Sequence, residues 1–322
     1  MGLLVEGTWQ DQWYNTSKSG GKFKRTVAQF RSWITSNGEV GPSGVAGFKA
    51  EKDRYHLYVS HACPWANRTL AVKTLKGLDD YITVDVVHPI MLGRGWSFDQ
   101  NYPMATGDSL HNHDYLHQIY TQVDQKITTR VTVPILWDTQ QKTIVSNESS
   151  EIIRMFNSAF DHLTGSTLDL YPQNLRTEID LINDRIYHDI NNGVYLAGFA
   201  TSQEAYNEAI ENLFNTLDWL DERLSSSRFL VNNTLTEADI RLAMTLFRFD
   251  PVYVQHFKTD KKRLVDYQYL WPYARRIYQW PGISDTVHFD HIREHYFRSH
   301  PTINPYAIMP VGAEIDWWAP VE

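Results

Sequence analysis

The sequence predicts an α/β domain followed by an all-helical domain. Residues 55–88 show the pattern of a strand, a helix and a strand, at Tyr55–Ser60, Pro64–Lys76 and Ile82–His88. This βαβ order implies that the two strands lie parallel in one sheet. From about residue 165 onward, apolar residues recur at helical spacing instead. The 322 residues are enough for two domains of ordinary size.

We expect four parts along the chain: an arm over residues 1–54, the α/β domain over 55–160, the helical domain over 170–300 and a tail over 301–322. The arm is polar and contains Gly and Ser, with one short helix that begins near Lys24 and carries Phe30, Trp33 and Ile34. The segment 38–47 that follows it holds four glycines and a proline and is expected to be a loop. The tail is rich in Pro and Trp and is expected to wrap the surface.

The helical domain has four long periodic segments. They are expected at Asn174–Asn191, Gln203–Leu224, Glu237–Asp250 and Leu270–Gln279, separated by Gly193–Thr201, Ser225–Leu235 and Tyr253–Tyr267. Thr236 and Asp239 have the spacing of a capping box at the start of the third helix, with Asp in place of the usual Glu or Gln.

Cys63 is the only cysteine, and the predicted elements place it on the turn from a strand into a helix. Pro64 suits the first helical turn, so Cys63 is expected at the helix N-cap, where free N–H groups and the helix dipole favour a thiolate. Ala66 stands where a Cys-x-x-Cys motif would have its second cysteine. Without a resolving cysteine, the thiolate must form a mixed disulfide with an external partner, and a second small thiol, such as glutathione, must then release it. The alternative is a buried, inert cysteine.

Residues 89–111 form a connection longer than usual, which suggests a functional loop or lid carrying Trp96. The strand Val131–Trp137 contains Pro134, which a central strand tolerates only with a special geometry. A cis Val133–Pro134 bond would turn the N–H and C=O of Val133 outward beside the cysteine turn, where they could pair with a peptide-like ligand.

The segment Asn147–Glu151 opens a further helix after a hairpin strand at Lys142–Val145. The N–H groups at Ser149 could hold a carboxylate, and Glu148 could hold an ammonium group. Glutathione carries both groups on its γ-glutamyl end. Plain helix capping is the alternative interpretation of these residues.

Composition narrows the classes of function. The net charge is −8 without a basic block, so nucleic acid is not expected as a partner. Apolar runs are too short for a membrane span, and one cysteine suits a reducing cytoplasm. The 11 Trp and 18 Tyr fit either a large aromatic core or a pocket for a flat aromatic ligand.

Two groups of histidines have spacings that need an interpretation. His288, His291 and His295 share one helical face, and His111, His113 and His117 are clustered in sequence. Both groups are more typical of packed or solvated histidines than of metal ligands, so no metal is expected.

Several stretches resemble the glutathione transferases, and among these the Xi class, the glutathionyl-hydroquinone reductases. The resemblance covers nearly the whole chain and rests on Leu57–Ala66, Val131–Asp138, Asn147–Ser149, Asn192–Ala200, Arg248–Lys258, His291–Phe297 and Ser299–Pro305. It implies a thioredoxin-like N-terminal domain, an all-α C-terminal domain, and a homodimer formed through the helical domains. Asn67, where the family pattern leads us to expect histidine, and the tail after Pro310 depart from it.

The resemblance also implies roles for individual residues. Cys63 would be the nucleophile, and glutathione would be held by Trp96, Arg130, Val133, Glu148 and Ser149. Tyr195, Tyr253 and Tyr296 would line the aromatic substrate site, with Tyr195 and Tyr296 as acids or hydrogen-bond donors.

The implied reaction is the glutathione-dependent reduction of glutathionyl-hydroquinones, through a mixed disulfide between Cys63 and glutathione. Two alternatives remain open: an omega-like thioltransferase or dehydroascorbate reductase, and a non-catalytic binding module. The cysteine turn argues against the module, because a scaffold needs no thiol at a helix N-terminus.

Overall fold

A computed structural model describes residues 2–321, which divide into two compact units. The first unit comprises residues 2–13, Thr26–Leu168 and Asp290–His295. The second comprises Tyr14–Arg25, Asp169–Phe289 and residues 296–321. The described residues contain no helix that is both long and apolar enough to span a membrane.

The first unit is built on strands. They are β1 (Leu3–Val5), β2 (Thr8–Gln10), β3 (Trp33–Thr35), β4 (Gly47–Lys49), β5 (Tyr55–Val59), β6 (Ile82–Val86), β7 (Thr129–Arg130), β8 (Ile135–Asp138) and β9 (Thr143–Ser146). Its helices are α1 (Pro64–Leu75), α2 (His117–Val123), α3 (Ser149–Ser158) and α4 (Asp161–Thr164).

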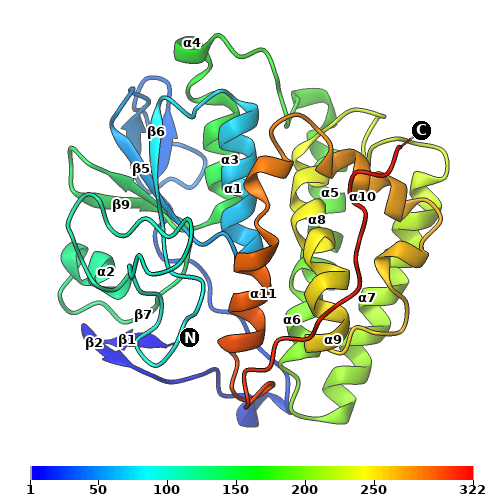
Figure 1. Cartoon of the computed structure of the whole chain (residues 1–322). Helices are drawn as coiled ribbons and strands as arrows, with labels where there is room; N and C mark the ends of the chain where they lie inside the picture. The colour runs from blue at the N-terminus through cyan, green and yellow to red at the C-terminus, as the bar shows by residue number, and fades with distance from the viewer. Residues whose placement is uncertain (1, 322) are drawn as a thin grey trace. The chain divides into compact units, whose positions relative to one another are not determined.

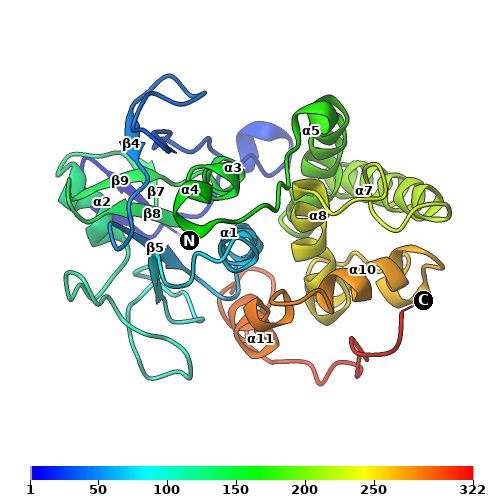
Figure 2. The same cartoon turned by 90° about the horizontal axis from the view of Figure 1, so that it is seen from above.

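The central sheet of this unit is mixed, in the order β6-β5-β8-β9. Strand β5 is buried along its whole length, because it pairs parallel with β6 on one side and antiparallel with β8 on the other. Helices α1 and α3 pack against each other and cover one face of the sheet, while α2 lies on the other face (Figures 1 and 2). This confirms the predicted thioredoxin-like arrangement.

Residues 1–54, expected as an arm, contribute four short strands from their described part. Strand β1 pairs with β2 and β7 in a second sheet, and β3 pairs parallel with β4. The predicted helix near Lys24 is wrong, because Ile34 lies in strand β3 and is fully buried. Gly47 permits this pairing, since a Cβ there would lie 2.2 Å from the carbonyl oxygen of Glu39.

The second unit is helical. It contains α5 (Arg176–Ile186), α6 (Gly193–Gly198), α7 (Gln203–Leu224), α8 (Glu237–Arg248), α9 (Val254–His256) and α10 (Leu270–Tyr278), and α11 (Phe289–Arg298) supplies residues to both units. Short turns are η1 (Ser17–Ser19), η2 (Gln173–Leu175), η3 (Tyr187–Asn191), η4 (Phe249–Tyr253), η5 (Leu264–Asp266) and η6 (Ser284–Thr286).

Helix α8 is anchored at its start by the predicted capping box. The Oδ2 atom of Asp239 accepts a hydrogen bond of 2.8 Å from the Thr236 N–H, and Oδ1 accepts bonds from the Leu230 N–H and the Tyr273 hydroxyl, both 2.9 Å. Helix α8 is followed by η4, a π-helical turn. Pro251 lies in that turn and cannot donate an α-helical hydrogen bond, which gives a reason for the widened turn.

Two expectations for the second unit differ from the structure. Residues 193–201, expected as a separator, contain helix α6, and a Cβ at Gly198 would lie 2.1 Å from the Phe257 ring. Gly198 is therefore the last residue of α6 and a site of close packing. The tail does not lie wholly on the surface, because Trp317 is buried against Phe247 and Phe289.

Candidate active site

Cys63 is the N-cap residue of α1, as predicted, with extended backbone angles (φ −78°, ψ 121°). Its carbonyl accepts a hydrogen bond of 2.9 Å from the Asn67 N–H, and its own N–H donates to Ser60 at 3.1 Å. The turn forms because β5 ends at Val59 and Pro64 begins the helix. The thiol is partly exposed, and it stands at the positive end of the helix dipole, which favours its reactive thiolate form.

The backbone of Val133 lies beside this thiol. The Val133–Pro134 peptide bond is cis, which confirms the prediction, and the Val133 carbonyl oxygen is 3.8 Å from the Cys63 sulfur. Within residues 2–321, the Val133 N–H has no hydrogen-bond partner. The turn therefore presents a peptide donor and acceptor next to a reactive sulfur.

The N-terminus of α3 is capped by Glu148. Its Oε1 atom accepts hydrogen bonds from the N–H and the hydroxyl of Ser150, at 3.0 and 2.7 Å. The capping interpretation is thus confirmed for Glu148, but Oε2 takes no part in the cap. Ser149 is the first helical residue and is buried, and Glu151 in the same turn forms an ion pair with Arg31 at 2.5 Å.

Trp96 and Arg130 belong to the same unit and are held by other contacts. The buried Trp96 ring stacks on His295, with centroids 4.7 Å apart. The guanidinium of Arg130 donates to the carbonyl oxygens of Gln12 and Trp13, at 2.5 and 3.3 Å. These two bonds tie Arg130 to the stretch that follows strand β2.

The three predicted tyrosines meet in the second unit. Tyr296 is at the centre, with its hydroxyl 2.6 Å from that of Tyr195 and 3.0 Å from that of Tyr253. Burial raises the pKa of Tyr253 and Tyr296 well above the ordinary value of 10.0, and the charge of Arg248 opposes this rise. Tyr253 and Tyr296 therefore keep their protons at neutral pH, and the cluster is a buried chain of hydroxyls joined by hydrogen bonds.

Two arginines beside the tyrosines were not predicted as site residues. Arg248 is fully buried and donates to the Met244 carbonyl at 2.7 Å. The guanidinium of Arg25 lies 4.9 Å from the centroid of the Tyr195 ring, and its Nε donates to Asn192 at 3.1 Å. Arg248 begins one of the stretches that carry the resemblance, whereas no pattern in the sequence marks Arg25.

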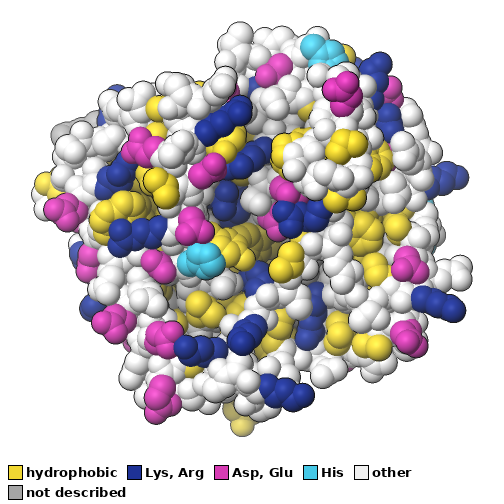
Figure 3. Space-filling model, turned by 180° about the vertical axis from the view of Figure 1, so that it is seen from behind, with side chains coloured by type: hydrophobic (Ala, Val, Ile, Leu, Met, Phe, Trp, Pro, Cys, Tyr) yellow, Lys and Arg dark blue, Asp and Glu magenta, His cyan; other side chains and the backbone are white. Residues whose placement is uncertain are grey.

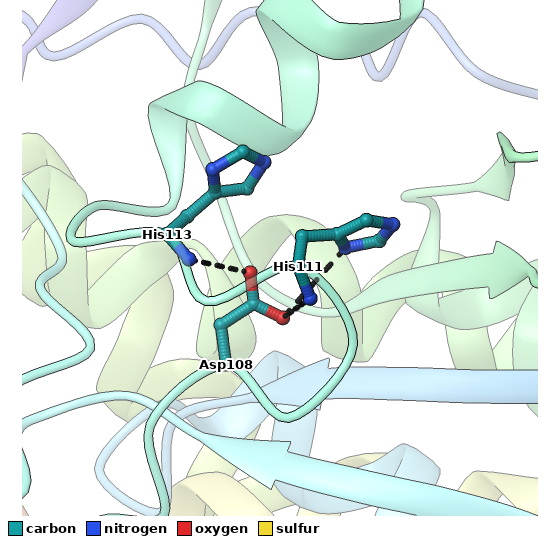
Figure 4. Close-up of side chains that lie close together, drawn as sticks. All are labelled: Asp108, His111 and His113. Carbon is teal, nitrogen blue, oxygen red and sulfur yellow. Dashed lines mark hydrogen bonds and ion pairs between the residues drawn. The ribbon is translucent and has the colours of Figure 1, made fainter.

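Asp108, His111 and His113 form a group with the composition of a metal site (Figure 4). However, Asp108 accepts hydrogen bonds from the backbone N–H groups of Leu110, His111 and His113, at 3.1 to 3.2 Å, and from the Tyr58 hydroxyl at 3.0 Å. The carboxylate therefore organises its own loop, which explains the group without a metal.

Asp108 and His113 also line a cleft of about 830 Å³ along residues 88–115. Cys63 and Val133 are not part of its lining. Figure 3 shows one face of the molecule, on which positive and negative side chains are interspersed. Such a face lacks the basic field that nucleic-acid binding requires.

Two family models match the chain. The model described as the glutathione S-transferase N-terminal domain matches residues 62–159, and the model of the C-terminal domain matches residues 203–276. The first match contains Cys63, Val133 and the start of α3, and the second contains helices α7 and α8.

The chain is also similar to characterised proteins over nearly its full length. It is 58% identical to the glutathionyl-hydroquinone reductase YqjG of Escherichia coli over 312 residues, which cover 97% of this chain and 95% of that protein. The glutathione-bound structure of YqjG matches with a TM-score of 0.92 and 54% identity, over 99% of this chain and 98% of that one. A Xi-class glutathione transferase from Natrialba magadii matches with a TM-score of 0.90 and 45% identity, over 99% and 95%.

Proposed function

Because the chain belongs to the Xi class of the glutathione transferase family, the glutathionyl-hydroquinone reductases, we propose that it reduces glutathionyl-hydroquinones to hydroquinones. Glutathione is the co-substrate, and oxidised glutathione is the second product. The observation that carries this proposal is the position of Cys63 at the N-cap of α1, 3.8 Å from the Val133 carbonyl.

In the first step, the Cys63 thiolate attacks the sulfur of the conjugate. A sulfur–sulfur bond forms between Cys63 and glutathione, and the bond from that sulfur to the aromatic carbon breaks. The electron pair of the broken bond stays on the ring carbon, which takes up one proton. The ring leaves as the hydroquinone, reduced by two electrons.

In the second step, the thiolate of free glutathione attacks the mixed disulfide. Oxidised glutathione leaves, and the Cys63 thiolate is restored. Since Ala66 replaces a second cysteine, this external thiol is required in every cycle. The two steps give ping-pong kinetics.

The proposal assigns glutathione to the residues of the first unit. The Val133 N–H and C=O pair with its peptide backbone, and the N-terminus of α3 at Ser149 accepts its γ-glutamyl carboxylate. The Oε2 atom of Glu148, which takes no part in the cap, attracts the ammonium group. Trp96 and Arg130 are the other two residues assigned to glutathione binding.

The proton for the ring carbon is assigned to the tyrosine cluster, with Tyr195 and Tyr296 as donors and Tyr253 as a further contact to the hydroquinone. The short bonds among the three hydroxyls support this role, because a tyrosinate formed at one position is stabilised by donors at the next. Arg248 also favours the charged form of the two buried tyrosines.

The proposal includes a homodimer formed through the helical unit and a location in the reducing cytoplasm. A single thiol that must remain reduced between cycles fits that compartment. Light scattering combined with size exclusion measures the assembly: a mass of two chains supports the dimer, and a mass of one chain refutes it.

The test of the reaction is to incubate the protein with a glutathionyl-hydroquinone. Release of the hydroquinone, together with one glutathionyl adduct on Cys63 in the intact mass, supports the proposal. An adduct formed from small disulfides without hydroquinone release would favour a thioltransferase. If a folded protein gives neither hydroquinone release nor an adduct, the non-catalytic binding module is the interpretation that remains.

A further inference from the structure

Two histidines of helix α11 hold the two ends of the Pro89–Pro103 segment, which carries Trp96. The Nε2 atom of His291 lies 2.7 Å from the Pro103 carbonyl oxygen, and the Nδ1 atom of His295 lies 2.9 Å from the Pro89 carbonyl oxygen. Both imidazoles are buried, and all of these residues belong to the first unit. The spacing of four residues places the two rings on one face of the helix.

These bonds determine the proton positions on the rings. A carbonyl oxygen only accepts, so His291 carries its proton on Nε2 and His295 carries its proton on Nδ1. Burial lowers the pKa of His291, which keeps that ring neutral near pH 7. The two histidines therefore act as fixed donors to the ends of the segment.

The same two rings contact the interior of the segment and the cysteine turn. The His295 ring stacks on Trp96 with an interplanar angle of 21° and centroids 4.7 Å apart. The His291 ring meets the edge of Tyr102 at 5.0 Å and the ring of His61 at 5.1 Å. His61 is two residues before Cys63, so His291 contacts both the segment and the turn that carries the thiol.

Other contacts order the start and the tip of the segment. The Trp9 indole donates to the Gly93 carbonyl at 2.8 Å, and the Gly95 N–H donates to Leu92 at 2.8 Å. Neither of these contacts involves the Trp96 ring. The ring stack of Trp96 and the bond at Pro89 both come from one residue, His295.

We propose that His291 and His295 are positioning residues that fix the Pro89–Pro103 segment and so hold Trp96 ready for glutathione. The proposal rests on the function proposed above, in which Trp96 contacts glutathione. It also gives a role to two histidines of α11 that the sequence pattern indicated to be packed or solvated.

Four variants separate the hydrogen bonds from the ring contacts. His295→Asn places an amide donor near the position of Nδ1 but removes the stack, whereas His295→Phe keeps an aromatic ring and removes the donor. His291→Gln retains a donor near the position of Nε2, and His291→Leu removes it. Ile82→Val, at the opposite end of strand β6 from the segment, controls for a general loss of packing.

The measurement is the Kd of glutathione by calorimetry, with the rate of Cys63 alkylation by iodoacetamide as a parallel readout. We expect His295→Asn and His295→Phe to weaken binding by about tenfold, because Trp96 is no longer held in one position. His291→Leu should weaken it more than His291→Gln. Alkylation should stay within about twofold of the wild-type rate in all variants, because the N-cap geometry at Cys63 is unchanged.

Limited trypsin digestion reports the segment directly, since Arg94 is exposed within it. Cleavage after Arg94 should become about tenfold faster in His291→Leu and His295→Phe, which lose the donors that hold the ends of the segment, and should be unchanged in Ile82→Val. An unchanged glutathione Kd in both His295 variants would overturn the proposal, whatever the cleavage rate. Glutathione binding and trypsin cleavage are both measured without a hydroquinone. A failure of the proposed reductase activity is therefore distinguished from a failure of this proposal.

Discussion

The Cys63 turn and the tyrosine cluster are built in opposite ways. The thiol stands beside two backbone groups, the N-terminus of α1 and the peptide group of Val133. The tyrosine cluster is made of side chains that come from α6, η4 and α11. Backbone N–H and C=O groups remain when neighbouring side chains are substituted. A site made of side chains loses a functional group with each substitution.

The largest effect is expected from Cys63→Ser, which removes the one reactive side chain of the thiol site. We expect activity to fall at least about a thousandfold, because a serine hydroxyl is a far weaker nucleophile than a thiolate. The helix should not suffer, since serine is a preferred N-cap residue. Hydroquinone release and the thermal midpoint measure the two effects. Appreciable residual activity would refute the mixed-disulfide mechanism.

The next effect is expected in the tyrosine cluster. Tyr296→Phe removes the hydroxyl that bonds both neighbours, so we expect kcat to fall by about a hundredfold. Tyr253→Phe breaks only one bond, of 3.0 Å, and should cost less. Steady-state kinetics give the order of the variants, and Cys63 alkylation is the control. Equal losses in both variants would argue against a central role for Tyr296.

Glu148→Gln tests whether glutathione binding at the thiol site requires a side-chain charge in addition to the backbone groups. The amide oxygen can still accept from Ser150, so the helix cap should survive, but the charge opposite the ammonium group is lost. We expect the KM for glutathione to rise about tenfold with little change in kcat. An unchanged KM would mean that the backbone alone is sufficient for binding.

The smallest effect is expected from Arg25→Gln, which removes the cation next to the Tyr195 ring. A partly exposed cation–π contact contributes about 1 kcal/mol, so kcat/KM should fall about fivefold. Lys22→Gln is the matched control, because Lys22 lies in the same stretch and forms only an exposed ion pair with Glu208. Similar losses in both variants would assign the effect to docking of that stretch instead of to the cation.

The comparison also explains which parts of the molecule the sequence could predict. Cys63 and Pro64 are adjacent, Val133 and Pro134 are adjacent, and Thr236 is three residues from Asp239, so their structures follow from local rules. The tyrosines have no such signal, because Tyr195 and Tyr296 are 101 residues apart. Only the resemblance to a family indicated that they belong together.

The errors have the same origin. The helical spacing of Phe30, Trp33 and Ile34 could not show that β3 pairs with Gly47–Lys49. Residues Gly193–Thr201 were expected to separate two helices, because the sequence does not reveal that Phe257 packs closely against Gly198 in helix α6. In both cases a partner distant in sequence determined the local structure. The bonds from His291 and His295 to Pro103 and Pro89 are of the same kind.

Ala66 makes the protein's working state depend on the supply of glutathione. It is buried one turn into α1, where a methyl group takes the place of a second thiol. The chain cannot clear its own mixed disulfide, so the fraction of protein held in that form rises as free glutathione falls. A capped sulfur is protected from irreversible oxidation to the sulfinic and sulfonic acids. In a cell short of glutathione, the protein would stop turning over in a protected form and resume when the thiol pool recovers.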